Sequence, residues 1–248
     1  MKGELYEMSK VSTYLELDLY LLMGQSNMAG RGELTDEEKI PNPSILKLDE
    51  NSSWIEAVEP VHFDKPSVVG VGPSLTFAKQ MLKNDSSKVI GLIPCAVGGT
   101  KLKRWGKGGD LYESAIQRAL EAMKYGKIKA ILWLQGESDS ALEDDALTYE
   151  ERLEQTIVNL RTDLNDENIP FIAGKIGDFL NKNQYAYVNT INLAIMNLKD
   201  KINNYDYVET AGFSHIGDFL HFNAYSAKEL GKRYASKYIE LINEKQNI

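Results

Sequence analysis

The chain alternates short, unbroken apolar runs with segments of helical periodicity. The runs at 17–24, 89–94, 130–134, 171–176 and 207–210 predict five strands, because continuous apolar stretches of this length are typical of strands buried on both faces. Apolar residues at helical spacing predict helices near 73–84, 110–124, 153–164, 188–202 and 227–241. We therefore predict an α/β fold, a three-layer α/β/α sandwich with a five-stranded parallel sheet.

Two parts of the chain fall outside this alternation. Residues 1–16 are expected to be an N-terminal extension, and residues 25–72 form a long excursion rich in proline and polar residues. Loops of this length in a compact domain are usually functional or partly structured. Because the strand before the excursion belongs with the strands after it, we expect 1–248 to form a single domain.

Composition excludes several classes of protein. The 248 residues include 36 Asp and Glu against 28 Lys and Arg, one Cys and three His, with a net charge of −8. A single Cys forms neither an internal disulfide nor a thiolate metal site, so a disulfide scaffold and a zinc finger are excluded and no metal site is expected. An acidic surface does not neutralise phosphates, so we expect no nucleic-acid partner.

Charged residues near the start of the chain interrupt the apolar stretch that a signal peptide would need. Glu4, Glu7, Glu16 and Asp18 break up the N-terminal segment, whereas a signal peptide needs an apolar stretch of about 7–15 residues. No run approaches the roughly 18 apolar residues of a membrane span. We expect a cytoplasmic protein that does not associate with membranes.

Polar and catalytic residue types follow each predicted strand. Ligands of open parallel sheets bind beyond the carboxyl ends of the strands, so these segments are expected to meet at one edge. They contribute hydroxyl, amide, carboxylate and imidazole groups at Gln25, Ser26, Asn27, Gly98, Gly99, Thr100, Gln135, Glu137, Asp218 and His221. Together they are typical of a hydrolytic site.

Ser26 is the candidate nucleophile and His221 the candidate base. A serine hydroxyl needs an adjacent base to take its proton, and Asp218, three residues before His221, is placed to hold the imidazole in the useful tautomer. Ser26 has the alternative role of a helix N-cap. His62 has no motif nearby, and His215 is expected to line the site without acting as the base.

Gly98, Gly99 and Gln135 are candidate oxyanion donors. A tetrahedral intermediate needs N–H groups aimed at its developing charge, and glycine lets a backbone N–H approach closely. The alternative for the two glycines is an ordinary flexible loop. Glu137 has two alternatives, a second carboxylate that orients His221 or a cap of the segment that follows.

Four blocks of this sequence resemble those of one superfamily. Residues 24–27 (GQSN), 98–100 (GGT), 135–137 (QGE) and the pair Asp218 and His221 are similar to the blocks of the SGNH hydrolases. More narrowly, they resemble the sialate O-acetylesterase-like branch that includes the acetylxylan esterases of carbohydrate esterase family six. The resemblance spans nearly the whole chain, from about residue 19 to 221.

The resemblance implies a flavodoxin-like fold and removal of acetyl groups from sugar hydroxyls without a metal or other cofactor. It implies that Ser26 is the nucleophile and His221 the base, with either Asp218 or Glu137 as the acidic partner. The oxyanion hole would use the Ser26 and Gly99 amides and the Gln135 side chain. One departure is that Leu134 precedes Gln135, where this branch commonly has His.

The loop after the second predicted strand is basic. It contains Lys101, Lys103, Arg104, Trp105 and Lys107. One interpretation is a rim that contacts substrate, with Trp105 against a sugar ring and the cations suited to an anionic sugar. The alternative is a solvated basic loop with a core-facing Trp105.

Our leading hypothesis is a serine esterase that deacetylates a small acetylated sugar or oligosaccharide. Gln25, Asn27, Gly98, Thr100, Trp105 and His215 are the expected substrate-binding residues. The alternatives are another short-chain esterase, thioesterase or acyltransferase of this superfamily, or a noncatalytic carbohydrate-binding protein. Neither the sugar nor the oligomeric state is predicted.

Overall fold

All strands of the described chain belong to one sheet. The computed structural model describes residues 16–246, so the expected N-terminal extension lies outside the described residues except for Glu16. Across these residues the sheet has seven strands in the order β3-β2-β4-β1-β5-β6-β7. The strands are β1 (Leu17–Gly24), β2 (Ile45–Leu48), β3 (Trp54–Glu56), β4 (Ile90–Pro94), β5 (Gly126–Leu134), β6 (Phe171–Gly174) and β7 (Tyr205–Val208).

The five predicted strands are present, and the strand count was wrong by two. β4, β1, β5, β6 and β7 pair in parallel, as predicted. The excursion at 25–72 adds β2, which is parallel to β4, and β3, which closes this edge as an antiparallel strand. Both added strands are short and carry polar residues such as Lys47 and Glu56, so the apolar pattern does not distinguish them from a loop.

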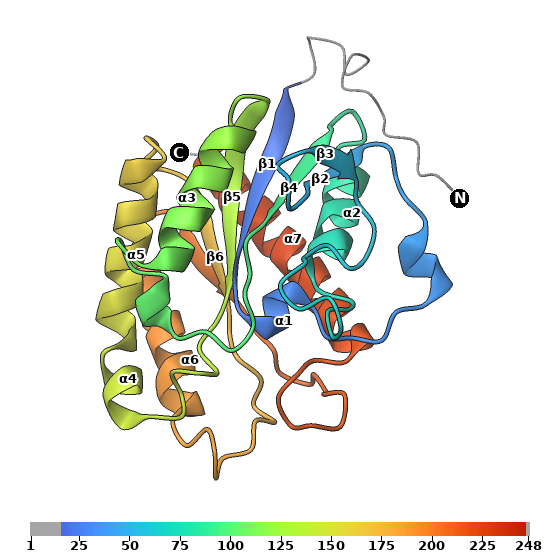
Figure 1. The fold of residues 1–248 in the computed structure, drawn as a ribbon. Coiled ribbons are helices and arrows are strands. Elements are labelled where there is room, and N and C mark those ends of the chain that lie inside the picture. The colour runs from blue at the N-terminus through green and yellow to red at the C-terminus, as the bar shows by residue number, and fades with distance from the viewer. Residues whose placement is uncertain (1–15, 247–248) are drawn as a thin grey trace.

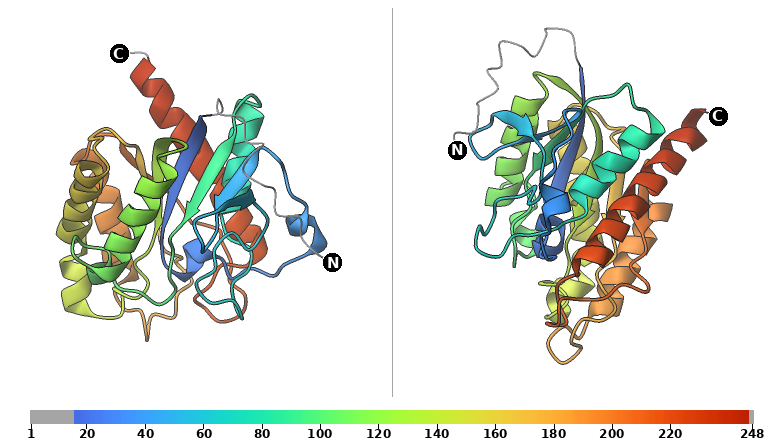
Figure 2. Two further views of the ribbon diagram at one scale, coloured as in Figure 1. Left: turned by 45° about the horizontal axis from the view of Figure 1, so that its top comes forward. Right: turned by 90° about the vertical axis from the view of Figure 1, so that its right-hand side faces the viewer.

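Helices cover both faces of the sheet (Figures 1 and 2). Buried side chains of α3 (Asp110–Ala122), α5 (Tyr149–Asp163) and α6 (Val188–Asn197) form a core on one face. Those of α2 (Ser74–Asn84) and α7 (Ala224–Gln246) form a second core on the other face. The three-layer α/β/α arrangement is therefore confirmed. Shorter helical segments are α1 (Ser26–Ala29), α4 (Glu143–Leu147) and the 3₁₀ turns η2 (Asp36–Lys39), η3 (Leu102–Arg104) and η4 (Leu198–Asp200).

Backbone hydrogen bonds continue past the ends of the central strands and align the loops that follow. The N–H of Val97 donates to the carbonyl of Gly24 at 3.0 Å, and the N–H of Gln25 donates to the carbonyl of Leu134 at 2.9 Å. The segments after β4 and β5 therefore lie on either side of the turn after β1. This register brings three of the sequence blocks to one place on the sheet edge.

No helix within residues 16–246 is both long enough and apolar enough to cross a membrane.

Candidate active site

Ser26 is the first residue of α1, directly after the central strand β1. Gln25 occupies the N-cap position and makes no side-chain cap bond, so the alternative of Ser26 as an N-cap is wrong. Ser26 is buried, and its hydroxyl is directed to His221. The distance between Ser26 Oγ and His221 Nε2 is 3.0 Å.

The other imidazole nitrogen of His221 contacts Asp218. The distance between His221 Nδ1 and Asp218 Oδ2 is 2.6 Å. The other carboxylate oxygen of Asp218 accepts the N–H groups of Leu220 at 3.0 Å and His221 at 2.9 Å. Ser26, His221 and Asp218 thus form one continuous hydrogen-bonded chain.

The surroundings of Asp218 favour its ionised form. Partial burial acts to raise its pKa, but the backbone N–H and imidazole of His221 and the N–H of Leu220 together hold the pKa below its ordinary value. A carboxylate that accepts several N–H bonds keeps its charge. Asp218 is therefore able to fix the proton of His221 on Nδ1, which leaves Nε2 free to accept a proton from Ser26.

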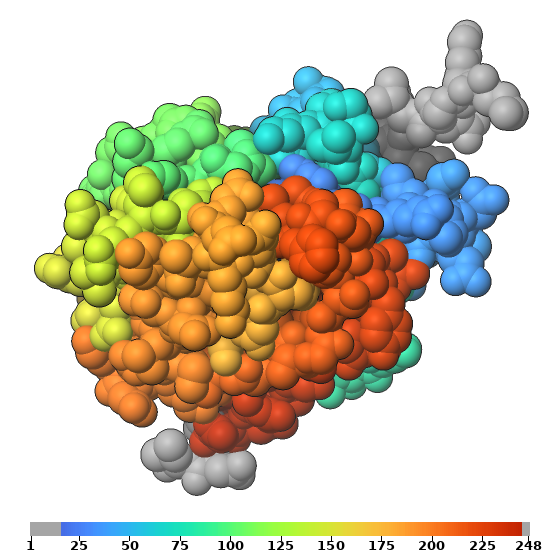
Figure 3. Space-filling model, turned by 90° about the horizontal axis from the view of Figure 1, so that it is seen from below, coloured from blue at the N-terminus to red at the C-terminus, as the bar shows by residue number. Residues whose placement is uncertain are grey.

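A pocket of about 440 Å³ opens over Ser26. Seen from the carboxyl edge of the sheet, blue atoms of the segment after β1 lie between the teal 60s segment and the orange-red 215–221 loop (Figure 3). The pocket is lined mainly by polar residues, together with the apolar side chains of Val68, Ile216 and Leu220. Its residues are Gln25, Ser26, Arg31, Lys65, Val68, Gly99, Glu137, Ser138, Tyr185, Ile216, Asp218, Leu220 and His221.

A buried ion pair holds the glycine block beside Ser26. Arg31 Nη2 lies 2.8 Å from Asp64 Oδ2, and the two side chains are 5% and 0% exposed. The same oxygen of Asp64 accepts the N–H of Gly98 at 2.8 Å. A Cβ on Gly98 would lie 2.5 Å from Arg31 Nη2 and 3.3 Å from the Ser26 Cβ, so only glycine fits here without a shift of the ion pair.

Gly99 lines the pocket and has a φ of +77°, a conformation that glycine adopts without strain. Within residues 16–246 its N–H has no hydrogen-bond acceptor. The N–H of Gly98 is taken by Asp64, so of the two glycines Gly99 is the one whose amide is available to a bound oxyanion.

Gln135 does not occupy the position expected of an oxyanion donor. The side chain is fully buried and does not line the pocket. Its Nε2 donates to the carbonyl of Thr100 at 2.9 Å and to Asp139 Oδ2 at 2.6 Å. These bonds use both amide hydrogens, so Gln135 ties the loop after β5 to the loop after β4 instead.

Within the described residues, Glu137 is hydrogen-bonded to Asn27 and not to His221. Asn27 Nδ2 donates to Glu137 Oε1 at 2.5 Å, and the other carboxylate oxygen is buried without a partner among these residues. Burial raises the pKa of Glu137 to about 7, although the bond from Asn27 acts in the opposite direction. Of the two candidate acids, the structure places Asp218 alone against the imidazole.

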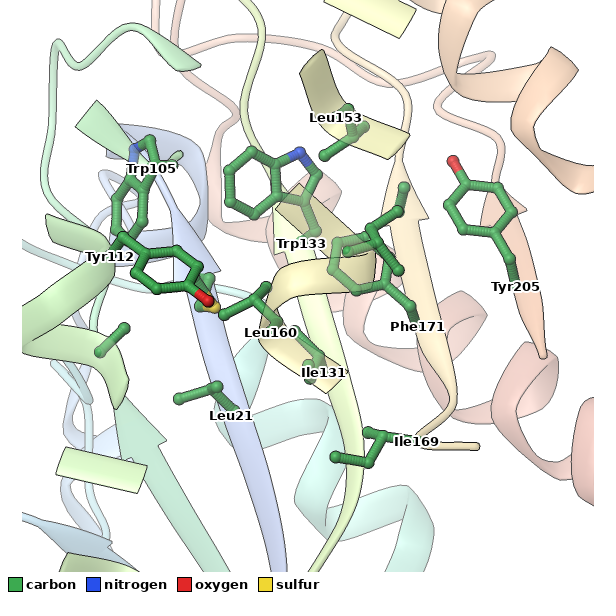
Figure 4. Close-up of a cluster of buried hydrophobic side chains, with 14 of the residues drawn as sticks. Leu21, Trp105, Tyr112, Ile131, Trp133, Leu153, Leu160, Ile169, Phe171 and Tyr205 are labelled. Atoms are coloured by element: carbon green, nitrogen blue, oxygen red, sulfur yellow. The ribbon is translucent and has the colours of Figure 1, made fainter. Parts of the chain in front are cut away.

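Trp105 belongs to the core, so the interpretation of a sugar-stacking rim is wrong. It is fully buried, packs edge-on against Trp133 at 5.7 Å between ring centroids and lies beside Tyr112 in the apolar cluster (Figure 4). Its indole N–H donates to Thr100 Oγ1 at 3.1 Å. Thr100 is also buried and does not line the pocket.

Three cations of the basic loop are paired with carboxylates. Lys101, Arg104 and Lys107 pair with acidic side chains at 2.6, 2.5 and 2.7 Å. None of these cations lines the pocket. Lys65, which comes from the excursion at 25–72, lines the pocket and has no ion-pair partner in the described chain.

The other two histidines have structural positions. His215 does not line the pocket; its Nδ1 accepts the N–H groups of Gly217 at 2.9 Å and Phe219 at 3.2 Å, so it shapes the loop that carries His221. His62 is fully buried, accepts the N–H of Ala96 at 3.3 Å, and burial lowers its pKa to about 3.

Most pocket residues that the sequence did not indicate come from irregular segments. Arg31, Lys65 and Val68 belong to the excursion, and Tyr185 and Ile216 belong to loops without a motif. The only signal for the first three was that long excursions in compact domains are usually functional. Neither that signal nor the motifs identified any of these five residues individually.

The fold and the arrangement of Ser26, His221 and Asp218 are those expected of an SGNH-type hydrolase. The chain belongs to the family described as carbohydrate esterase, sialic acid-specific acetylesterase (SASA), whose model matches residues 16–240. The predicted resemblance is therefore confirmed, and the protein is a carbohydrate esterase, which is a carboxylic ester hydrolase.

Individual relatives agree with this assignment. A probable carbohydrate esterase of Arabidopsis thaliana is 38% identical over 241 residues, which cover 89% of this chain and 90% of the relative. An X-ray structure of an Arabidopsis thaliana protein matches with a TM-score of 0.83 at 37% identity, covering 91% of this chain and 98% of that one. NanS shares the fold, with a TM-score of 0.76 at 17% identity over 92% of this chain and 98% of its own.

Proposed function

We propose that this carbohydrate esterase removes acetyl groups from a small sugar through a triad of Ser26, His221 and Asp218. The observation that carries the proposal is the unbroken hydrogen-bond chain from Asp218 through His221 to Ser26 Oγ on the floor of a pocket. Serine acyl transfer requires a nucleophile, a base that takes its proton, and an acid that orients the base.

In the first half-reaction, Ser26 Oγ attacks the acetyl carbonyl as His221 Nε2 takes its proton. The negative charge that develops on the carbonyl oxygen would be received by the N–H groups of Ser26 and Gly99, because preorganised donors stabilise such a charge strongly. The intermediate collapses when the protonated His221 gives its proton to the sugar oxygen. The sugar leaves and Ser26 carries the acetyl group.

In the second half-reaction, water takes the place of the sugar hydroxyl. His221 removes a proton from the water, which attacks the acetyl-Ser26 carbonyl, and the proton returns to Ser26 Oγ as acetate leaves. Asp218 holds the imidazole through both halves and stabilises its charged form.

For the substrate, we propose an acetylated sugar that carries a carboxylate. Lys65 supports this because it is a pocket-lining cation without an ion-pair partner among residues 16–246. The description of the matching family as sialic acid-specific supports the same substrate class. A neutral acetylated xylo-oligosaccharide is the competing substrate.

One experiment tests the reaction and the substrate together. Acetate release is measured from O-acetylated sialic acid and from acetylated xylo-oligosaccharides with the wild type, Ser26→Ala and Lys65→Met. We expect Ser26→Ala to lose turnover on both while it keeps its melting temperature. We expect Lys65→Met to raise KM for the sialic acid alone, with Lys103→Met as the matched control.

Two results would contradict the proposal in different ways. Full acetate release by Ser26→Ala would exclude the triad mechanism. Sugar binding by the wild type without any acetate release would indicate a noncatalytic carbohydrate-binding protein. Equal effects of Lys65→Met on the charged and neutral substrates would remove the carboxylate from the substrate class and leave the triad intact.

A further inference from the structure

Asn27 joins the segment after Ser26 to both sides of His221. Its Nδ2 donates to the carbonyl of Leu220 at 3.1 Å, and its Oδ1 accepts the N–H of Phe222 at 2.9 Å. Leu220 and Phe222 are the immediate chain neighbours of His221, and Asn27 is the immediate neighbour of Ser26. One side chain therefore clamps the base-bearing loop to the segment that carries the nucleophile.

The clamp works in only one orientation of the Asn27 amide. Nδ2 donates hydrogen bonds and Oδ1 accepts them. In a flipped amide, Nδ2 would face the N–H of Phe222, which is also a donor, and Oδ1 would face the carbonyl of Leu220, which is also an acceptor. The second hydrogen of Nδ2 is taken by Glu137 Oε1 at 2.5 Å. A carboxylate only accepts hydrogen bonds, so Glu137 holds the amide nitrogen on the side that the clamp requires.

Among residues 16–246, the Glu137 carboxylate accepts its only side-chain hydrogen bond from Asn27. It is fully buried. Within residues 16–246, its Oε2 has no hydrogen-bond partner, and Glu137 makes no hydrogen bond or ion pair with His221. The two acidic side chains near the site therefore act on different parts of His221. Asp218 contacts the imidazole ring, and Glu137 is connected to the backbone on each side of it.

We infer that Glu137 is a positioning residue, which fixes the Asn27 amide so that Asn27 clamps the residues on either side of His221 and sets the distance between Ser26 Oγ and His221 Nε2. This inference rests on the proposed triad function. It assigns Glu137 a role separate from that of the acid that orients the imidazole.

The experiment compares variants that keep or remove the acceptor. Glu137→Gln keeps an oxygen that accepts from Asn27, whereas Glu137→Leu removes it and fills the buried space. We expect Glu137→Leu and Asn27→Ala each to lower kcat by about 100-fold with little change in KM, because a misplacement of about 1 Å costs on this order. Glu137→Gln should lower kcat far less.

The double variant separates a shared role from two independent roles. If Glu137 acts through Asn27, the variant carrying both Glu137→Leu and Asn27→Ala falls no further than the more severe single variant. Asn192→Ala is the matched control. Asn192 is another buried amide that ties a loop backbone, with bonds to the N–H and carbonyl of Ile176 at 2.9 and 3.0 Å, and its loss should lower stability without lowering kcat.

A readout that does not depend on activity completes the test. We expect Glu137→Leu to speed amide hydrogen exchange at Phe222, whose N–H donates to Asn27, while Glu137→Gln leaves it slow. The inference is overturned if Glu137→Gln is as damaging as Glu137→Leu, if the two losses multiply in the double variant, or if Phe222 exchange does not change. Failure of the triad proposal is recognised separately, by full activity in Ser26→Ala.

Discussion

At the scale of single residues, Asp218 is distinguished by the number of N–H groups that it accepts. Its carboxylate is held by two backbone N–H groups and by the imidazole of His221, and its pKa lies below its ordinary value. These contacts keep the Asp218 carboxylate ionised and orient it toward His221 Nδ1. They explain why Asp218, with an exposed side, is a better candidate for the acid of the triad than the fully buried Glu137.

Replacing Asp218 with Asn should reduce kcat severely. The amide cannot stabilise the imidazolium and favours the wrong tautomer, and this loss costs on the order of 10⁴-fold in a serine triad. The measurement is kcat for acetate release. Asp110→Asn is the control, because Asp110 is exposed and pairs with Arg104, away from the pocket. A variant that retains near wild-type kcat would show that another group supports His221.

Single residues also show where sequence patterns stop being informative. Ser26, His221 and Asp218 were predicted because their chemistry and order are specific. The sequence allowed Trp105 either on the pocket rim or in the core, because tryptophan occurs in both environments. Its packing against Trp133 in the structure shows that it belongs to the core. Gln135 was assigned an oxyanion role, whereas its amide hydrogens are taken by Thr100 and Asp139.

At the scale of elements, the irregular excursion at 25–72 is what completes the site. It supplies β2 and β3 to the sheet, and it supplies Arg31, Asp64 and Lys65 to the pocket region. The Arg31–Asp64 pair fixes the loop after β4 through the N–H of Gly98. The long segment is therefore a structural part of the site. Periodicity could not reveal it, because its helical and strand segments are each only three or four residues long.

The Arg31–Asp64 pair should be important for stability. Replacing Arg31 with Met leaves the fully buried carboxylate of Asp64 unpaired, which costs about 3–5 kcal/mol of unfolding free energy. Arg104→Met removes a solvent-exposed partner of Asp110 and should cost far less unfolding free energy, because exposed ion pairs contribute little to stability. Urea unfolding of both variants measures the difference. Equal costs would show that the buried pair does not hold the excursion in place.

At the scale of the whole molecule, the five central strands and both helical layers follow from the apolar pattern of the chain. Their buried positions are dictated by the hydrophobic effect and leave a continuous signal in the sequence. The edge strands and the pocket walls are set by long-range contacts between loops. Those contacts leave no local period, so they became visible only in the structure.

Buried carboxyl groups make the stability of the molecule depend on pH. Glu59 is buried, and burial raises its pKa from 4.5 to about 7 despite bonds from the N–H groups of Val61 and Gly72. At pH values between 4.5 and about 7, Glu59 keeps its proton in the folded state and releases it in the unfolded chain. The free energy of unfolding therefore falls as pH rises through this window, by up to about 3 kcal/mol from Glu59 at about 1.4 kcal/mol per pKa unit.

Glu59→Gln should remove this contribution. Relative to the variant, the wild type is expected to lose stability as the pH rises from 5 to 7.5, and urea unfolding at the two values measures the change. Glu33→Gln, which alters an exposed carboxylate, should follow the wild type. The same pH dependence in Glu59→Gln as in the wild type would show that Glu59 does not carry the raised pKa.

The central claim is that Ser26 becomes covalently acetylated during turnover. The most direct measurement is acid quenching of the enzyme during steady-state hydrolysis of 4-nitrophenyl acetate, followed by mass spectrometry of the peptide that contains Ser26. This peptide is expected to gain one acetyl group in the wild type and none in Ser26→Ala, which also loses turnover. Acetate release at the wild-type rate by Ser26→Ala, or acetylation at a different residue that turns over, would contradict it.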